Sequence, residues 1–258
     1  MFVEPDRTPY DWNFRLWGFN VRVHPLFWVG AVVLGANNLE RRDGYGILFL
    51  LIWVSVVFTS ILVHELGHAL AFRRFGTNSH IILWMFGGLA IPHSLLRGRA
   101  RRITVAVAGP IAGFLLCGLV YGTNRLAPWA SSQSLLPVQY LYLALIFVNL
   151  FWGIFNLLPV FPLDGGQICR ELCGWKWPGH GLKMALRISV GVAAAIAGFT
   201  FLGALGALRD LPWWAQGSWY TTILFAVLAI QSYLLLKQLE PSSEYHLEGF
   251  DDDRPPWR

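Results

Sequence analysis

Six long stretches of the sequence carry no charged residue other than histidine, and polar segments separate them. Each contains or approaches the roughly 20 apolar residues that a helix needs to cross the hydrocarbon core of a bilayer. The uncharged stretches are 23–39, 44–64, 103–124, 126–163, 188–208 and 211–236. The pattern predicts an all-α integral membrane protein with about six transmembrane helices, near 24–38, 46–70, 103–122, 139–158, 187–208 and 219–237.

The first of these helices has a second interpretation. Its dense apolar run, 26–36, is short, and Arg15 and Arg22 precede it, which is also typical of a signal peptide. The segment before it is long for a signal peptide and contains aromatic residues between 12 and 19 that suggest structure. We therefore expect a retained helix, and removal by processing stays the alternative.

Composition agrees with a membrane protein and adds an orientation. Of all residues, 55% are hydrophobic and 14% charged, against roughly a quarter charged in a typical soluble domain. With a cytoplasmic amino terminus, 16 of the 20 Lys and Arg fall on the cytoplasmic side, so the positive-inside rule predicts both termini in the cytoplasm. The net charge of +5 is then an orientation signal, and we expect no nucleic-acid partner.

Three segments describe the expected domain organisation. Residues 1–23 form a cytoplasmic amino-terminal segment, and residues 24–240 form one polytopic membrane domain. Residues 241–258 are acidic and contain proline, which predicts a short disordered tail.

Candidate chemistry occurs at the end of the second helix, in the sequence His64-Glu65-Leu66-Gly67-His68. Residues four apart lie on one face of a helix, so His64 and His68 can bind one metal ion. Glu65 would lie beside the ion and accept a proton from the attacking water. Ionisable residues within an apolar helix are expensive and indicate a functional site.

A catalytic zinc site needs a third protein ligand. Two acidic residues lie near the same predicted membrane face, Asp164 and Glu171. Asp164 ends the fourth apolar stretch within 156–166, where two prolines interrupt the helix and two glycines follow the carboxylate. Irregular backbone at membrane depth is tolerated where it lines a cavity. The alternative for Asp164 is a structural role as the cap of a following helix.

Together these motifs resemble the site-2 protease family of intramembrane zinc metalloproteases, in its small form without a PDZ or nucleotide-sensing domain. The family carries H-E-x-x-H on one transmembrane helix and N-x-x-P-x-x-P-L-D-G-G on a later one, here on helices of about 46–72 and 139–166. The resemblance implies one zinc ion per chain with three ligands, a catalytic glutamate, a pocket asparagine, and a substrate-binding segment. By this resemblance the zinc ligands would be His64, His68 and Asp164, and the catalytic glutamate would be Glu65. Asn156 would be the pocket asparagine. The substrate-binding segment would contain Phe86, Gly87 and Gly88.

The segment 79–92 predicts a short membrane-associated β-strand or loop after the second helix, because it is rich in β-forming residues and contains Gly87-Gly88. A peptide substrate could add to the edge of such a strand through main-chain hydrogen bonds. The alternative is an amphipathic stretch lying at the membrane interface.

The resemblance further implies the hydrolysis of peptide bonds in or near transmembrane segments of membrane proteins. It implies residence in the lipid bilayer of a bacterial inner membrane and leaves open a regulatory membrane partner or a homo-oligomer. Two alternatives remain: a zinc protease of the prenyl-protein-processing type with Glu171 as third ligand, and a non-enzymatic membrane transporter or scaffold.

Overall fold

The computed structural model of the chain describes residues 4–41, 44–85, 87–131, 133–208 and 218–239. Within these residues, five helices are long and apolar enough to cross a membrane, by length and composition. They are α2 (Gly46–Arg74), α3 (Arg99–Leu126), α4 (Leu136–Asn156), α6 (Gly181–Ala204) and α7 (Trp219–Gln238). The expected fold class, a helical membrane protein with a small β component, is confirmed.

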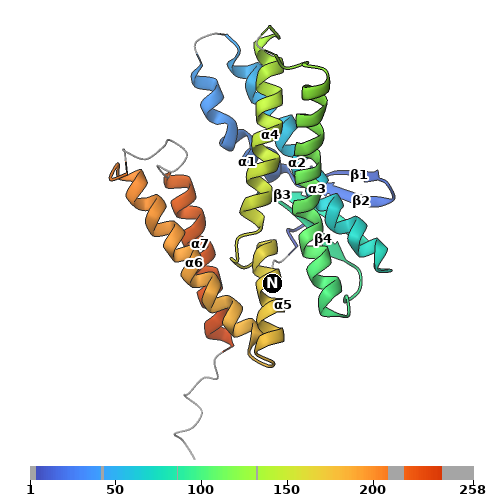
Figure 1. Ribbon diagram of the computed structural model, residues 1–258, viewed down its shortest axis with the longest axis vertical. Coiled ribbons are helices and arrows are strands. Elements are labelled where there is room, and N and C mark those ends of the chain that lie inside the picture. Colours follow the sequence, from blue (N-terminus) through green and yellow to red (C-terminus); the bar gives the residue numbers. More distant parts are fainter. Residues whose placement is uncertain (1–3, 42–43, 86, 132, 209–217, 240–258) are drawn as a thin grey trace, which may run out of the picture.

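The first expected helix is shorter than a membrane span. Helix α1 covers Pro25–Gly35, 11 residues, which is about 16 Å at 1.5 Å per residue and half of the hydrocarbon thickness. A 3-10 helix, η1 (Ala36–Glu40), follows it. Figure 1 shows α1 rising from the β-strands at mid-height of the helical bundle. A short helix is therefore enough to reach the end of the molecule where α2 begins.

A four-stranded sheet replaces the single strand that we expected. The strands are β1 (Trp12–Leu16), β2 (Phe19–Val23), β3 (Ser79–Trp84) and β4 (Gly87–Pro92), in the order β1-β2-β3-β4. Strands β2 and β3 are parallel and the other pairs are antiparallel. The segment 79–92 is thus a hairpin, with the two glycines at the start of β4. Among the described residues β4 is an edge strand.

The sequence pattern did not predict the amino-terminal hairpin of β1 and β2, because a charged residue interrupts its apolar positions. Its buried side chains alternate, with Phe19, Val21 and Val23 at most 3% exposed, but Arg22 stands between them. The Arg22 guanidinium is also buried, because it pairs with Glu4 at 2.9 Å and Asp11 at 3.0 Å. A charged residue that seemed to flank a membrane span is therefore part of a packed sheet.

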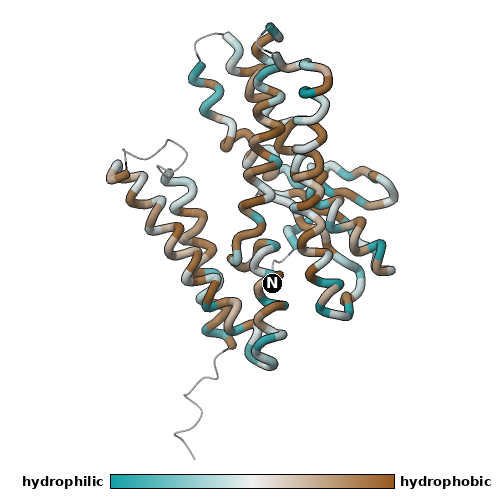
Figure 2. Tube along the Cα trace, viewed as in Figure 1, coloured by the Kyte–Doolittle hydropathy of each residue, from teal (hydrophilic) through white to brown (hydrophobic). Residues whose placement is uncertain are grey.

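The helices form two groups that meet at the loop after α4. One core joins the sheet with α1, α2 and α4. A second core joins that loop with α6 and α7 through Val160, Ala193, Phe225 and Leu228. Large apolar side chains such as Ile47, Leu115 and Ile223 face outward. Figure 2 shows hydrophobic residues over most of the long helices, with hydrophilic segments mainly toward their ends, as a lipid environment requires.

Candidate metal centre

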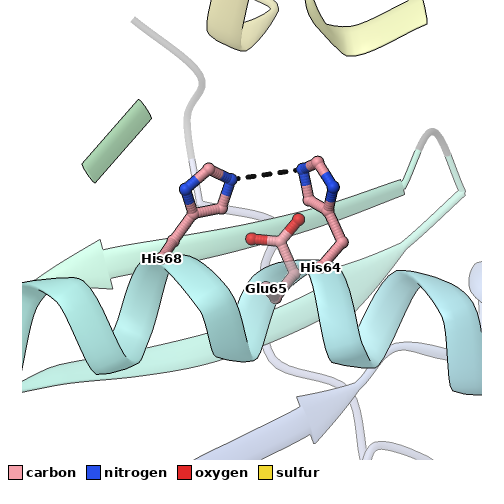
Figure 3. Close-up of side chains that lie close together, drawn as sticks. All are labelled: His64, Glu65 and His68. Atoms are coloured by element: carbon pink, nitrogen blue, oxygen red, sulfur yellow. Dashed lines mark hydrogen bonds between the residues drawn. The ribbon is translucent and has the colours of Figure 1, made fainter. Parts of the chain in front are cut away.

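Helix α2 brings the first three candidate residues together. His64, Glu65 and His68 are 3%, 4% and 7% exposed, and their ligand atoms lie within 4.8 Å of one another. The Nε2 atoms of His64 and His68 are 3.2 Å apart, and Figure 3 shows the two rings facing each other above the helix with Glu65 between them. The four-residue spacing therefore places both imidazoles on one face, as expected.

Asp164 completes the group from a distant part of the chain. Its Oδ2 lies 3.1 Å from His64 Nε2 and 3.3 Å from His68 Nε2. It is the first residue of α5 (Asp164–Lys176), a helix that the apolar pattern did not predict. Gly165 and Gly166 lie in the first turn of α5 and not in a turn of their own. A Cβ on Gly166 would lie 2.6 Å from the backbone of Val160 and Phe161, so glycine is needed for the close approach of the loop.

The donor set fits a zinc ion. The three atoms form a nearly equilateral triangle with sides of 3.1, 3.2 and 3.3 Å. Ligands about 2.0–2.1 Å from a tetrahedral zinc are about 3.3 Å apart. Two imidazoles and one carboxylate also leave the fourth position free for water, as in hydrolytic zinc sites. The residues present therefore match the metal that the motif implies.

The ring of His68 is held by α3. Its Nδ1 lies 2.7 Å from the carbonyl oxygen of Val105, and because a carbonyl can only accept, Nδ1 carries the proton and donates. The lone pair of Nε2 then points into the metal centre. A hydrogen bond to the second nitrogen is the usual way in which proteins orient a metal-binding histidine.

Two glycines allow α2 and α3 to approach at this point. A Cβ on Gly67 would collide with the carbonyl oxygen of Ala108, and one on Gly109 would collide with His68 Nε2 and lie 2.8 Å from His64 Nε2. Gly109 thus borders both imidazoles, which the sequence could have indicated only through the pairing of α2 with α3.

Strand β4 runs past Glu65. A Cβ on Gly88 would collide with the side chain of Glu65, and a Cβ on Gly87 would lie 2.8 Å from the Trp152 ring. Gly87 lines a neighbouring cavity, whereas Gly88 lines the cavity that contains Glu65. Phe86 lies outside the described residues.

Asn156 lines the cavity that contains His64, Glu65 and His68. The cavity has a volume of about 320 Å³ and is bordered by the metal centre, β4, α3, the end of α4 and α5. One amide hydrogen of Asn156 is used, because Nδ2 donates to the carbonyl oxygen of Trp152 at 2.9 Å.

Glu171 is engaged elsewhere. Its carboxylate pairs with Arg102 at 2.6 Å and with Arg170 at 3.0 Å. Burial by itself would raise the pKa of this carboxyl, but the hydrogen bonds and charges of the two arginines outweigh it, so the pKa lies below its ordinary value. Glu171 therefore joins α5 to α3, and the alternative with Glu171 as third ligand is not favoured.

Two buried histidines, the Asp164 carboxylate and the neighbouring Glu65 thus form one cluster in a chain with long apolar helices. The model of Peptidase family M50 matches residues 52–129 and 127–197, which include every residue of this centre. The chain belongs to this family, and with its five apolar helices it is an integral membrane protein.

Three relatives of the chain carry the name zinc metalloprotease or putative zinc metalloprotease. The chain is 29% identical over 71% of its length to a zinc metalloprotease of Methanocaldococcus jannaschii, covering 50% of that protein. It is 34% identical over 67% of its length to a putative zinc metalloprotease of Synechocystis, covering 44% of it. A putative zinc metalloprotease of Mycobacterium tuberculosis is 29% identical over 71% of the chain, which covers 47% of that protein. The chain thus spans about half the length of these relatives.

The fold has a solved counterpart. The site-2 protease from Methanocaldococcus jannaschii superposes with a TM-score of 0.57 and 19% sequence identity, covering 91% of this chain and 99% of that one. The arrangement of sheet and helices described above is therefore the fold of that protein.

Proposed function

We propose that this chain is an intramembrane zinc metalloendopeptidase that cleaves peptide bonds in or near transmembrane segments of membrane proteins. The observation that carries the proposal is the triangle of His64, His68 and Asp164 with Glu65 beside it. One zinc ion bound by these three residues would supply Lewis acidity to the peptide carbonyl and make a water molecule more acidic.

Glu65 is the catalytic acid and base. Its carboxylate lies beside the histidines without being needed as a ligand, so it accepts a proton from the attacking water. It then delivers this proton to the nitrogen of the leaving amine. Asn156 stands at the edge of the cavity, where its second amide hydrogen would donate to the substrate carbonyl or to the developing oxyanion.

The edge of β4 is the substrate-binding element. A peptide bond in a helix is sheltered by its own hydrogen bonds, so a transmembrane substrate must unwind before it is cleaved. An extended strand added to β4 would satisfy the unwound backbone groups. Since Gly88 contacts Glu65, a peptide paired with this strand would pass the catalytic carboxylate.

The chain's place in the membrane follows from the same features. We expect a bacterial inner membrane with both termini in the cytoplasm, because most Lys and Arg residues then lie on that side. The short α1 is compatible with this orientation, since it starts from the sheet at mid-height (Figure 1). The acidic tail, 241–258, lies outside the described residues, and its disorder stays a prediction, as do the domain limits 1–23 and 24–240.

The proposal is tested by comparing membrane-protein fragments in cells that express the wild type, Glu65→Gln or Glu40→Gln. Glu40 is exposed in η1 and serves as the matched control. Fragments ending within or next to transmembrane segments should accumulate with the wild type and Glu40→Gln and fall at least 100-fold with Glu65→Gln, because a general base contributes about 10²–10⁴-fold. Cleavage undiminished in Glu65→Gln would refute the protease assignment.

The ligand set is tested by bound zinc. Purified wild type should contain one zinc per chain, and Asp164→Ala should lose it, because two imidazoles alone bind zinc weakly. Glu171→Ala should keep its zinc, since this carboxylate pairs with Arg102 and Arg170. Full zinc content in Asp164→Ala would show that this aspartate is not a ligand.

A further inference from the structure

Two buried serines hold the loop that precedes Asp164. Ser189 on α6 and Ser232 on α7 are both 0% exposed. The amide of Phe161 donates to Ser189 Oγ at 2.7 Å, and Ser232 Oγ donates to the carbonyl oxygen of Phe161 at 3.2 Å. The two hydroxyl oxygens are 2.8 Å apart. Both backbone groups of a single loop residue are thus satisfied by side chains from two different helices.

The proton positions in this network are fixed by its geometry. The hydroxyl hydrogen of Ser232 is used on the Phe161 carbonyl, so the Ser232 oxygen accepts from Ser189. Ser189 in turn accepts from the Phe161 amide. The three bonds form a closed ring without a spare donor. Removing either hydroxyl leaves a partly buried backbone group of Phe161 without this partner, which is costly where water is scarce.

Phe161 is closely coupled to the metal centre. It lies three residues before Asp164, and the intervening chain is compact, because the amide of Leu163 donates to the carbonyl oxygen of Val160 at 2.9 Å. Val160 itself is buried in the core with α6 and α7. The position of the Asp164 carboxylate therefore depends on the α6–α7 pair, whereas His64 and His68 depend on α2.

We propose that Ser189 and Ser232 are positioning residues that hold Phe161 and thereby place Asp164 against the two histidines. Through them α6 and α7 control the geometry of the metal centre without contributing a ligand. The inference rests on the proposed function in one respect, the assignment of Asp164 as a zinc ligand.

The test is the rate at which zinc passes from the purified protein to a chelator in Ser189→Ala and Ser232→Ala. Thr222→Val is the matched control, because Thr222 Oγ1 donates to Thr200 Oγ1 at 3.1 Å and joins the same two helices away from the loop. Each serine variant should release zinc about tenfold faster than the wild type, as is common when a group that orients a metal ligand is removed. Thr222→Val should stay within about twofold. The double serine variant should resemble the single variants, since both changes open one ring.

Hydrogen exchange of the segment 157–163 supplies a measurement that does not depend on metal or proteolysis. It should quicken in both serine variants and not in Thr222→Val. Zinc release and exchange equal to those of Thr222→Val would overturn the inference. Should His64→Ala retain zinc as firmly as the wild type, the proposed metal centre fails instead. In that case exchange alone decides whether the serines hold the loop.

Discussion

At the scale of single residues, the metal centre depends as much on missing side chains as on its ligands. Gly67 lies within the sequence 64–68, and Gly88 and Gly109 lie against its side chains. A Cβ at any of the three would collide with a neighbouring element, with Glu65 or with His68. Small residues are common between membrane helices because they allow close approach. Here the approach also brings the backbone of α3 next to the imidazoles, so that Val105 can orient His68.

Gly109→Ala should abolish zinc binding. The added methyl group would collide with His68 Nε2 and lie 2.8 Å from His64 Nε2, which forces the two ligands out of position. Metal analysis of the purified variant checks this. Gly118→Ala is the control on the same helix, since nothing lies within 4 Å of a Cβ there. It should keep zinc and raise the free energy of unfolding by up to about 1 kcal/mol. Equal zinc content in the two variants would contradict the role of Gly109.

At the scale of elements, α5 matters most because it carries Asp164 and is fastened on two sides. Its first turn follows the loop held by α6 and α7. Its second half is tied to α3 by the Glu171–Arg102 pair. The helix was not expected from the apolar pattern, since it is amphipathic and follows a proline-rich interruption. Its place in the fold is set by these contacts and not by its own sequence pattern.

The Glu171 pairing should stabilise the protein in a pH-dependent manner. The pKa of Glu171 is lowered in the folded chain from its ordinary value of 4.5. The stabilisation is therefore complete above that value and is lost as the pH falls through the lowered pKa. Thermal unfolding in detergent from neutral to acidic pH should show Glu171→Gln less stable than the wild type near neutrality, with the difference shrinking below pH 4.5. A difference that grows on acidification would contradict this pairing.

At the scale of the whole molecule, the first helix has only 11 residues, fewer than a membrane span needs. The sheet lies at mid-height of the bundle (Figure 1), and β2 leads directly into α1. We expect strand and helix together to complete the crossing predicted for residues 24–38, with pairing between strands satisfying backbone groups that a helix would satisfy internally.

Both termini should therefore lie on the same side of the membrane. Fusion of a fluorescent protein that matures only in the cytoplasm should give a signal at either terminus. A phosphatase that is active only outside the cytoplasm should be active when inserted between α3 and α4. Termini on opposite sides would show that α1 and the sheet do not complete a crossing.

Much of this centre was open to prediction from the sequence. The four-residue spacing of His64 and His68 fixes their common face on any helix, and the interrupted helix before Asp164 marks a cavity. The sheet was harder, because Arg22 resembles a membrane flank until its partners Glu4 and Asp11 are known. The sequence could not predict the roles of Gly109, Ser189 and Ser232, because these roles depend on which helices become neighbours.

The sequence alone determined the membrane class, the long helices and the identity of the candidate metal-binding residues, because apolar length and helical periodicity are local properties. The tertiary structure decided how 100 residues of separation between His64 and Asp164 become 3.1 Å between their side chains. It also decided that α6 and α7 hold the loop carrying the third candidate ligand. These features depend on packing and hydrogen bonds between distant segments, and no local pattern encodes them.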